Sequence, residues 1–260
     1  MKTVFYKYQG AGNDFVIIDN RAGSFPSGNP DPISSICDRR FGVGADGLIL
    51  LENSSEADFK MVYFNADGFQ GSMCGNGGRC LVAFAKSLGI FENKTEFEAN
   101  GNLYKASVVN DRVSLSMLDV DRIDNFEGYA FLDTGSPHHV TFTKDVSEID
   151  VVGRGRKIRF GEPYGDAGTN VNFVEQKDES TFRVRTYERG VENETLSCGT
   201  GVTAVALASY FLEKTSSERV RIETRGGDLE VSFKYDKSRF HNIVLNGPAT
   251  FVFKGEIEVE

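Results

Sequence analysis

The sequence predicts an α/β (α+β) protein of two pseudo-symmetric halves, each a mostly antiparallel, barrel-like β-shell around a central helix. Short apolar runs separated by Gly, Asn and Asp dominate the chain, which is typical of many short strands. Only two segments, residues 74–88 and 198–212, are long and apolar enough to be helices buried on nearly all sides. Both begin with a cysteine followed by glycine, which suggests that they occupy equivalent places.

The expected strands are distributed over both halves of the chain. In the first half they cover residues 3–8, 15–19, 48–52, 59–64 and 103–109. In the second half they cover residues 129–133, 172–176, 182–187, 220–224, 229–235 and 243–245. Gly89 is expected to end the first long helix as its C′ residue. A third helix, short and amphipathic, is expected over residues 32–39.

A shift of 124 residues aligns the two long segments and further parts of the chain. Cys74 falls on Cys198, and Tyr63 falls on Tyr187. The same shift places residues 44–47 on 168–171 and residues 13–16 on 137–140. Matches in one order at one spacing indicate two halves of similar fold. We therefore expect a first domain over residues 1–118, a second over 119–247, and a tail, 248–260, that packs back on the first.

Composition narrows the class of protein. The chain has 260 residues, 40% of them hydrophobic and 26% charged, which is ordinary for a globular protein with a substantial core. The net charge of −9 argues against nucleic acid or an anionic membrane as the main partner. No apolar stretch is long enough to span a bilayer, and the first residues lack the apolar region of a secretory signal. A cytoplasmic location is expected.

The four cysteines do not form a metal-binding or disulfide pattern. No C-x₂-C pair occurs, so neither a structural zinc site nor any other metal site is predicted. Disulfides are unusual in a reducing compartment. Cys37 and Cys80 lie in apolar surroundings and are interpreted as small buried side chains.

Cys74 and Cys198 are different because each stands where a helix begins. A helix start presents unpaired N–H groups and a partial positive charge, which favours a thiolate over a thiol. The glycines that follow let a ligand approach the backbone closely. The same N–H groups can hold a carboxylate.

If both helix starts face one cleft between the halves, the carbon next to a bound carboxylate lies between two sulfur atoms. One sulfur, as thiolate, takes the α-proton, and the other, as thiol, returns a proton on the opposite face. Backbone amides stabilise the charge that develops on the carboxylate. The sequence thus indicates an epimerase or racemase that acts on an amino acid without a cofactor.

Several motifs carry a family resemblance over essentially the whole chain. Residues 63–68 (YFNADG) with 73–80 (MCGNGGRC), and residues 186–190 (TYERG) with 194–201 (ETLSCGTG), are similar to the two cysteine signatures of the diaminopimelate epimerase family. Further similar segments, in the family's order, are residues 10–15, 42–47, 135–138, 168–173, 247–249 and 253–256.

This resemblance implies interconversion of LL- and meso-2,6-diaminopimelate without pyridoxal phosphate or metal, in lysine and peptidoglycan precursor synthesis. It implies that Cys74 and Cys198 are the acid and base, and that His138 and Glu188 tune the thiols. It implies a substrate site formed by side chains and backbone amides of Asn13, Asn65, Gly75, Asn76, Ser136, Asn170, Glu188, Arg189, Gly199 and Thr200. Glu188 would lie near the α-ammonium and Arg189 near the distal end. The family is often dimeric, so a homodimer is expected.

The sequence departs from the family pattern beside the catalytic loops. Phe69 stands where a small hydroxyl residue is usual, and the connection at residues 191–193 is one residue longer than usual. Ser136 occupies a position often held by Asn. These departures bear on substrate affinity more than on reaction type.

Other interpretations remain open from the sequence alone. Residues 42–47 satisfy G-x-G-x-x-G, but a helix precedes them and a strand follows, the reverse of a dinucleotide site, so a turn is expected. His138 could be an ordinary loop histidine. The functional alternatives are a proline-racemase-like enzyme, a non-catalytic amino-acid-binding module, and a thiol-redox protein.

Overall fold

The computed structural model describes residues 2–71 and 73–259, so Met1 and Glu260, the outermost residues of the expected domains, lie outside it. Over the described residues the protein is a mixed α/β chain, mostly strand, with four helices. The chain divides into two units: Met1–Leu115 together with Gly247–Glu260, and Ser116–Asn246. No helix among the described residues combines the length and apolar character needed to cross a membrane.

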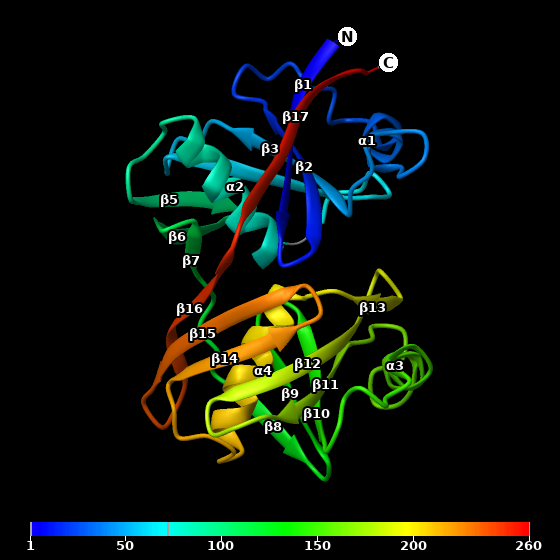
Figure 1. Ribbon diagram of the computed structural model, residues 1–260, viewed down its shortest axis with the longest axis vertical. Coiled ribbons are helices and arrows are strands. Elements are labelled where there is room, and N and C mark those ends of the chain that lie inside the picture. Colours follow the sequence, from blue (N-terminus) through cyan, green and yellow to red (C-terminus); the bar gives the residue numbers. More distant parts are fainter. Residues whose placement is uncertain (1, 72, 260) are drawn as a thin grey trace. The chain divides into compact units, whose positions relative to one another are not determined.

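The first unit contains two helices and most of the strands of the first half of the chain (Figure 1). β2 and β3 are parallel, β4 and β5 are parallel, and antiparallel pairs join β3 to β4 and β5 to β6. β1 pairs antiparallel with both β2 and β17. The elements are β1 (Lys2–Gly10), β2 (Asn13–Asp19), α1 (Pro30–Cys37), β3 (Gly47–Glu52), β4 (Phe59–Asn65), α2 (Gly75–Ser87), β5 (Lys94–Ala99), β6 (Asn102–Val109), β7 (Arg112–Ser116) and β17 (Thr250–Glu258).

The second unit follows the same order of pairing. β10 and β11 are parallel, β12 and β14 are parallel, and antiparallel pairs join β9 to β10, β11 to β12 and β14 to β15. Its elements are β8 (Ile123–Phe126), β9 (Tyr129–Asp133), β10 (Pro137–Thr143), α3 (Val151–Phe160), β11 (Asn170–Gln176), β12 (Thr181–Glu188), β13 (Asn193–Thr195), α4 (Gly199–Phe211), β14 (Arg219–Thr224), β15 (Gly227–Tyr235) and β16 (Phe240–Pro248).

Each long helix is packed by strands of its own unit. α2 contacts β1, β2, β3, β4, β6 and β17, and α4 contacts β9, β10, β11, β12, β14 and β15. Figure 1 shows α4 enclosed by the strands around it. A helix that is apolar around most of its circumference is stable only when it is surrounded in this way. The boundaries of α2 and α4 differ by 124 residues at both ends, the shift seen in the sequence.

The predicted helix boundaries differ from the observed ones by one or two residues. Cys74 and Cys198 are N-cap residues, so both helices begin one residue later than predicted. Gly89 follows the C-cap with a φ of 72°, as predicted for a C′ glycine. The short helix covers Pro30–Cys37 rather than residues 32–39, because Asn29 caps it and two prolines occupy its first turn.

Sequence reasoning missed α3 and strands β5, β7, β8, β10, β13 and β17. β17 is exposed along most of its length, so no alternation of buried and exposed side chains marks it. α3 contains Gly153 and Gly155, which have low helix propensity. A Cβ at Gly155 would lie 2.4 Å from Cβ of Tyr187 on β12, so this glycine permits close contact between the helix and the sheet.

Replacing Gly155 with alanine is expected to destabilise the protein by about 1–3 kcal/mol, although alanine is the better helix former. The reason is the collision with Tyr187, which is fully buried and has no room to withdraw. Urea denaturation measures the effect. Val152→Ala, on an exposed position of the same helix, is the control and is expected to change stability by about 0.5 kcal/mol or less. Equal effects of the two substitutions would contradict this account of Gly155.

Candidate active site

Cys74 takes the place of a capping side chain at the start of α2. Its backbone is extended, with φ −103° and ψ 118°, and its Sγ accepts a hydrogen bond from the backbone N–H of Gly77 at 3.5 Å. Serine or aspartate normally accepts this bond. The sulfur therefore lies at the positive end of the helix, where a negative charge is favoured.

An amide pair orients the surroundings of Cys74. Nδ2 of Asn13 donates to Asp46 Oδ2 at 2.6 Å, which turns Oδ1 of Asn13 toward the helix start. That oxygen accepts from Asn76 Nδ2 at 3.2 Å and from Cys74 Sγ at 3.7 Å. Asn13 begins β2 and Asn76 is the second residue of α2, so this contact joins strand to helix at the thiol.

Cys198 holds the corresponding place at the start of α4. Its backbone is again extended, with φ −126° and ψ 117°, and the residue is 8% exposed. Its Sγ lies 3.4 Å from the hydroxyl of Thr200. The backbone carbonyl of Thr200 accepts from Thr134 Oγ1 at 2.9 Å, which holds the first turn of α4 against the segment after β9.

A chain of hydrogen bonds runs from buried strand residues to Cys198. Asn172 Nδ2 donates to the carbonyl of His139 at 3.0 Å, and its Oδ1 accepts from Thr186 Oγ1 at 3.0 Å, so its orientation is fixed. The same Nδ2 lies 3.1 Å from His138 Nδ1, which must therefore be the acceptor.

The proton of His138 is consequently on Nε2, which donates to Thr200 Oγ1 at 2.9 Å. With its oxygen occupied as an acceptor, the Thr200 hydroxyl is available to donate to Cys198 Sγ. Such a donor stabilises a thiolate. Burial lowers the pKa of His138 to about 3, with the nearby charge of Arg189 as a second cause, so this imidazole is neutral at physiological pH. Its contact with Thr200 is therefore that of a neutral donor.

The remaining predicted residues of the second unit gather at the ends of β11 and β12. Asn170 Oδ1 accepts from the backbone N–H of Arg189 at 2.9 Å, and its Nδ2 donates to Ser136 Oγ at 2.9 Å. The exposed side chain of Arg189 donates to the carbonyl of Ala167 at 2.9 Å. Glu188 is the last residue of β12 and is half-buried.

The helix-start amides and Asn65 complete the predicted set. Gly75 and Gly199 are the first residues of α2 and α4, and both are buried. Asn65 ends β4 and is exposed, and a Cβ at Gly71 would lie 3.0 Å from its Oδ1. Within the first unit the structure thus brings Asn13, Gly75 and Asn76 to Cys74. Within the second it brings Thr200 and His138 to Cys198.

Sequence reasoning missed further polar residues behind these sites, namely the buried Asn172, Thr186 and Thr134 and the exposed Asp46. Asn172 lies in the segment 168–173, which is similar to the family, but a single asparagine on a strand does not by itself indicate a role at the site. Cys37 and Cys80 are buried, as predicted, and burial raises the pKa of each thiol to about 12.

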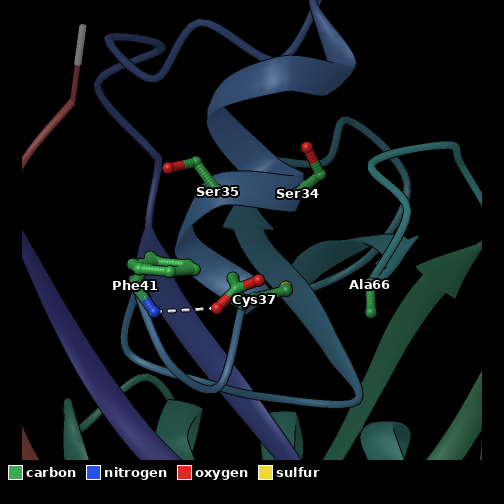
Figure 2. A pocket seen from close by; sticks show the side chains of 6 residues that line it. Ser34, Ser35, Cys37, Phe41 and Ala66 are labelled. Atoms are coloured by element: carbon green, nitrogen blue, oxygen red, sulfur yellow. Dashed lines mark hydrogen bonds between the residues drawn. The ribbon is translucent and has the colours of Figure 1, made fainter.

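A surface hollow beside α1 contains none of the predicted site residues. Figure 2 shows its lining, in which the backbone N–H of Phe41 donates to Asp38 Oδ1 at 2.7 Å. Its cysteine is Cys37, a buried neutral thiol. This hollow offers no ionised thiol and is distinct from the helix starts.

Phe69 and the longer connection at residues 191–193, where the sequence departs from the family pattern, both form hydrogen bonds with neighbouring residues. The carbonyl of Phe69 accepts from the N–H of Asn65 at 2.9 Å, while its ring is 64% exposed. In the longer connection, Glu192 accepts from Tyr187 Oη at 3.0 Å and from Arg159 Nε at 3.1 Å. The added length is therefore anchored to β12 and α3.

Comparison with solved structures defines the class of fold. The chain matches a Bacillus anthracis phenazine biosynthesis protein of the PhzF family with a TM-score of 0.80, at 14% identity and 100% coverage of both chains. It matches a hydroxyproline epimerase from Agrobacterium vitis with a TM-score of 0.69, at 14% identity, covering 98% of this chain and 92% of the other. The chain therefore has the fold shared by the PhzF protein and the hydroxyproline epimerase.

Comparison of sequences identifies the family. The family model for diaminopimelate epimerase matches residues 5–121 and 130–252. The diaminopimelate epimerase of Flavobacterium psychrophilum is 56% identical over 253 residues, covering 97% of this chain and 99% of that protein. The diaminopimelate epimerase of Chlorobaculum tepidum is 46% identical, covering 95% and 98%. The chain belongs to the diaminopimelate epimerase family, a family of isomerases.

The buried neutral state of His138 predicts a loss of stability in acid. Its pKa is lower in the folded chain, about 3, than the ordinary 6.5, so the unfolded chain binds the extra proton between these values. The free energy of unfolding should therefore fall as pH falls from 6.5 toward 3, with His138 contributing up to about 1.4 kcal/mol per pH unit.

Urea denaturation at several pH values tests this expectation. His138→Gln should show a shallower decline than the unsubstituted protein across that window. An unchanged slope in His138→Gln would contradict the buried neutral assignment.

Proposed function

We propose that the chain interconverts LL- and meso-2,6-diaminopimelate by exchanging the proton on one α-carbon. Membership of the family and 56% identity with a diaminopimelate epimerase over nearly the whole chain support this activity most strongly. The reaction would serve lysine and peptidoglycan precursor synthesis and would use neither pyridoxal phosphate nor a metal. The equivalent placement of Cys74 and Cys198 at two helix starts supports the same chemistry independently.

We further propose that the two halves are pseudo-symmetric β-shells around α2 and α4, with the active site in the cleft between them. The common order of strand pairing and the 124-residue shift between the helices support this architecture. The proposal assigns the domains to residues 1–118 with the tail 248–260, and to residues 119–247. The working assembly is a homodimer.

In the proposed reaction the backbone amides at Gly75-Asn76 and Gly199-Thr200 hold the α-carboxylate of the substrate. One cysteine, as thiolate, removes the α-proton, and the negative charge spreads onto the carboxylate, where the amides stabilise it. The other cysteine, as thiol, donates its proton to the opposite face of the same carbon. The thiol and thiolate have then exchanged states, and the configuration is inverted.

The other side chains orient the substrate. Glu188 pairs with the α-ammonium group and Arg189 with the distal carboxylate, while Asn13, Asn65, Ser136 and Asn170 donate or accept hydrogen bonds around it. The exposed guanidinium of Arg189 and its anchored backbone suit recognition of a charged far end. His138 tunes Cys198 through Thr200, and Glu188 contributes to the charge at the same thiol.

Cys74→Ser and Cys198→Ser are each expected to reduce epimerisation by at least about 100-fold. A hydroxyl is a far weaker acid than a thiol and is not ionised at neutral pH, so it replaces neither the thiol that donates the proton nor the thiolate that removes it. The measurement is conversion of LL- to meso-diaminopimelate by chiral chromatography. L-proline is tested as a second substrate, and its racemisation would favour the alternative of a proline-racemase-like enzyme. Cys37→Ala is the control and should retain activity. Near-normal turnover by either serine variant would contradict the two-base assignment.

Arg189→Ala is expected to weaken substrate binding by roughly 10- to 100-fold, because a charge-assisted hydrogen bond to the distal carboxylate is lost. Calorimetry in a Cys74→Ser background measures binding without turnover. Arg183→Ala is the matched control, because Arg183 lies on β12, the strand that Arg189 directly follows, and is paired with Glu223. Equal affinity with and without the Arg189 side chain would reject its role at the distal end.

A further inference from the structure

Arg79 is a fully buried cation near Cys74; we call the residues around Cys74 the first half-site and those around Cys198 the second. It lies on the second turn of α2, five residues after Cys74, and is 0% exposed. Its guanidinium makes three hydrogen bonds to neutral oxygens. Nη2 donates to Asn76 Oδ1 at 3.0 Å, Nη1 donates to the carbonyl of Gly75 at 3.3 Å, and Nε donates to the carbonyl of Pro248 at 3.4 Å.

Other buried or partly buried cations among the described residues have a carboxylate partner. Lys7 pairs with Asp14, Arg159 with Glu192, and Arg185 with Glu194. For Arg79, by contrast, no carboxylate oxygen among residues 2–71 and 73–259 lies within 4.0 Å. A buried charge without an ionic partner is costly, so its presence requires a compensating anion or a function.

Arg79 remains charged in spite of its burial. Burial lowers its pKa to about 10, which is still well above neutral pH. Negative charge on Cys80, and to a smaller extent on Cys74, acts in the opposite direction and favours the charged guanidinium. Because the interaction is mutual, the guanidinium equally favours the thiolate of Cys74.

The guanidinium also fixes the direction of an amide at the thiol. The oxygen and nitrogen of an asparagine side chain can exchange places by a flip of the amide. The bond from Arg79 Nη2 to Asn76 Oδ1 decides this orientation and aims Asn76 Nδ2 at Asn13 Oδ1, which faces Cys74 Sγ. Arg79 is thus connected to the thiol through two amides.

The backbone leaves room for this arrangement at Gly10, the last residue of β1. A Cβ there would lie 3.2 Å from the carbonyl oxygen of Asn76, 3.2 Å from Cys80 Sγ and 3.4 Å from Arg79 Nη2. Any side chain at Gly10 would press on the first turns of α2. The space around the guanidinium is therefore set by more than one element.

The other titratable groups around this turn are neutral, are paired with an opposite charge, or have a weaker electrostatic effect on Arg79. Cys80 is a buried thiol whose pKa burial raises to about 12. Asp14 on β2 is paired with Lys7 and Arg39. Arg112 on β7 is a weaker influence on Arg79 than Cys74 is. Within α2, Arg79 is the cation on the turn nearer the thiol, whereas Lys86 lies in the last turn.

We propose that Arg79 is a positioning residue of the epimerase reaction, which orients the Asn76–Asn13 amide pair at Cys74 and supplies the positive charge that supports its thiolate. The inference rests on the proposed function of Cys74. The acceptor oxygen of Asn13 favours the thiol, whereas the guanidinium favours the thiolate. Their opposition keeps the two states close in energy, as a group that is acid in one direction and base in the other requires.

Two substitutions separate the charge from the geometry. Arg79→Met keeps much of the side-chain volume and removes both charge and donors, and Arg79→Lys keeps the charge but not the planar fork of donors. Arg21→Met, at an exposed arginine paired with Asp19, is the matched control. Circular dichroism establishes that each variant is folded.

The first measurement is the rate of alkylation of Cys74 by iodoacetamide as a function of pH, followed by peptide mass spectrometry so that Cys198 is read separately. In Arg79→Met the midpoint of the Cys74 profile should rise by about one pH unit, while that of Cys198 stays in place. In Arg79→Lys the Cys74 midpoint should stay near that of the unsubstituted protein. Arg21→Met should change neither.

The second measurement is epimerisation. We expect kcat to fall roughly 10- to 100-fold in Arg79→Met and less in Arg79→Lys, with a smaller change in KM, because the lost charge acts at the reacting thiol. An unchanged Cys74 profile in folded Arg79→Met would overturn the proposal. Arg79→Gln is the second neutral variant, and failure of both neutral variants to fold would show that Arg79 serves the fold alone and would equally overturn it.

The two proposals fail in different ways. If the unsubstituted protein does not epimerise diaminopimelate, the proposed function is wrong, and the alkylation profiles still decide whether Arg79 supports the thiolate. If the unsubstituted protein is active and Arg79→Met matches it in both measurements, the proposed function stands and the role of Arg79 is wrong.

Discussion

The N–H groups at the start of a buried helix are the feature on which the site depends. In α2 one of these groups, from Gly77, is bonded to Cys74 Sγ itself. In both α2 and α4 the cysteine is the N-cap residue, so its sulfur lies at the positive end of the helix. Both helices are buried over most of their length, and the strands packed against them fix the position of each start. Burial of the helix and placement of the thiol at its positive end are therefore parts of one arrangement.

The two half-sites share this plan but surround the sulfur differently. Cys74 has an amide acceptor, Asn13 Oδ1, and a buried guanidinium within its helix. Cys198 has a hydroxyl donor, Thr200, which a neutral imidazole orients through Nε2. At the 124-residue shift, Arg79 falls on Thr203, an uncharged residue whose hydroxyl donates to the carbonyl of Gly199. One thiol is thus adjusted by charge, and the other by a chain of hydrogen bonds.

Much of this structure could be predicted from the sequence, and the exceptions have physical causes. α4 is apolar on all sides, and only burial stabilises such a helix in a globular protein; α2 was recognisable from its apolar run Leu81–Ala85 and its matching cysteine and glycine start. α3 was missed because Gly155, which weakens the helical pattern, is required for contact with Tyr187. β17 was missed because it pairs with β1 while leaving most of its side chains exposed.

The same distinction holds at the site. Cys74 and Cys198 were recognisable because their glycine-rich surroundings are themselves a pattern. Asn172 gives no such signal, because an asparagine on a buried strand acquires its meaning from His138 and Thr186, which are distant in sequence. The orientation of an amide or the tautomer of an imidazole is decided by its neighbours in space.

The central claim is that two thiols act on opposite faces of one α-carbon. The most direct test is to start from LL-diaminopimelate in deuterated water and to follow deuterium in both stereoisomers during the first part of the reaction. Two bases predict that the meso product carries deuterium at the inverted carbon while the remaining LL substrate stays unlabelled. A single base that removes and returns the proton would label the recovered substrate as fast as the product, or would deliver product that retains protium, and either result would contradict the account.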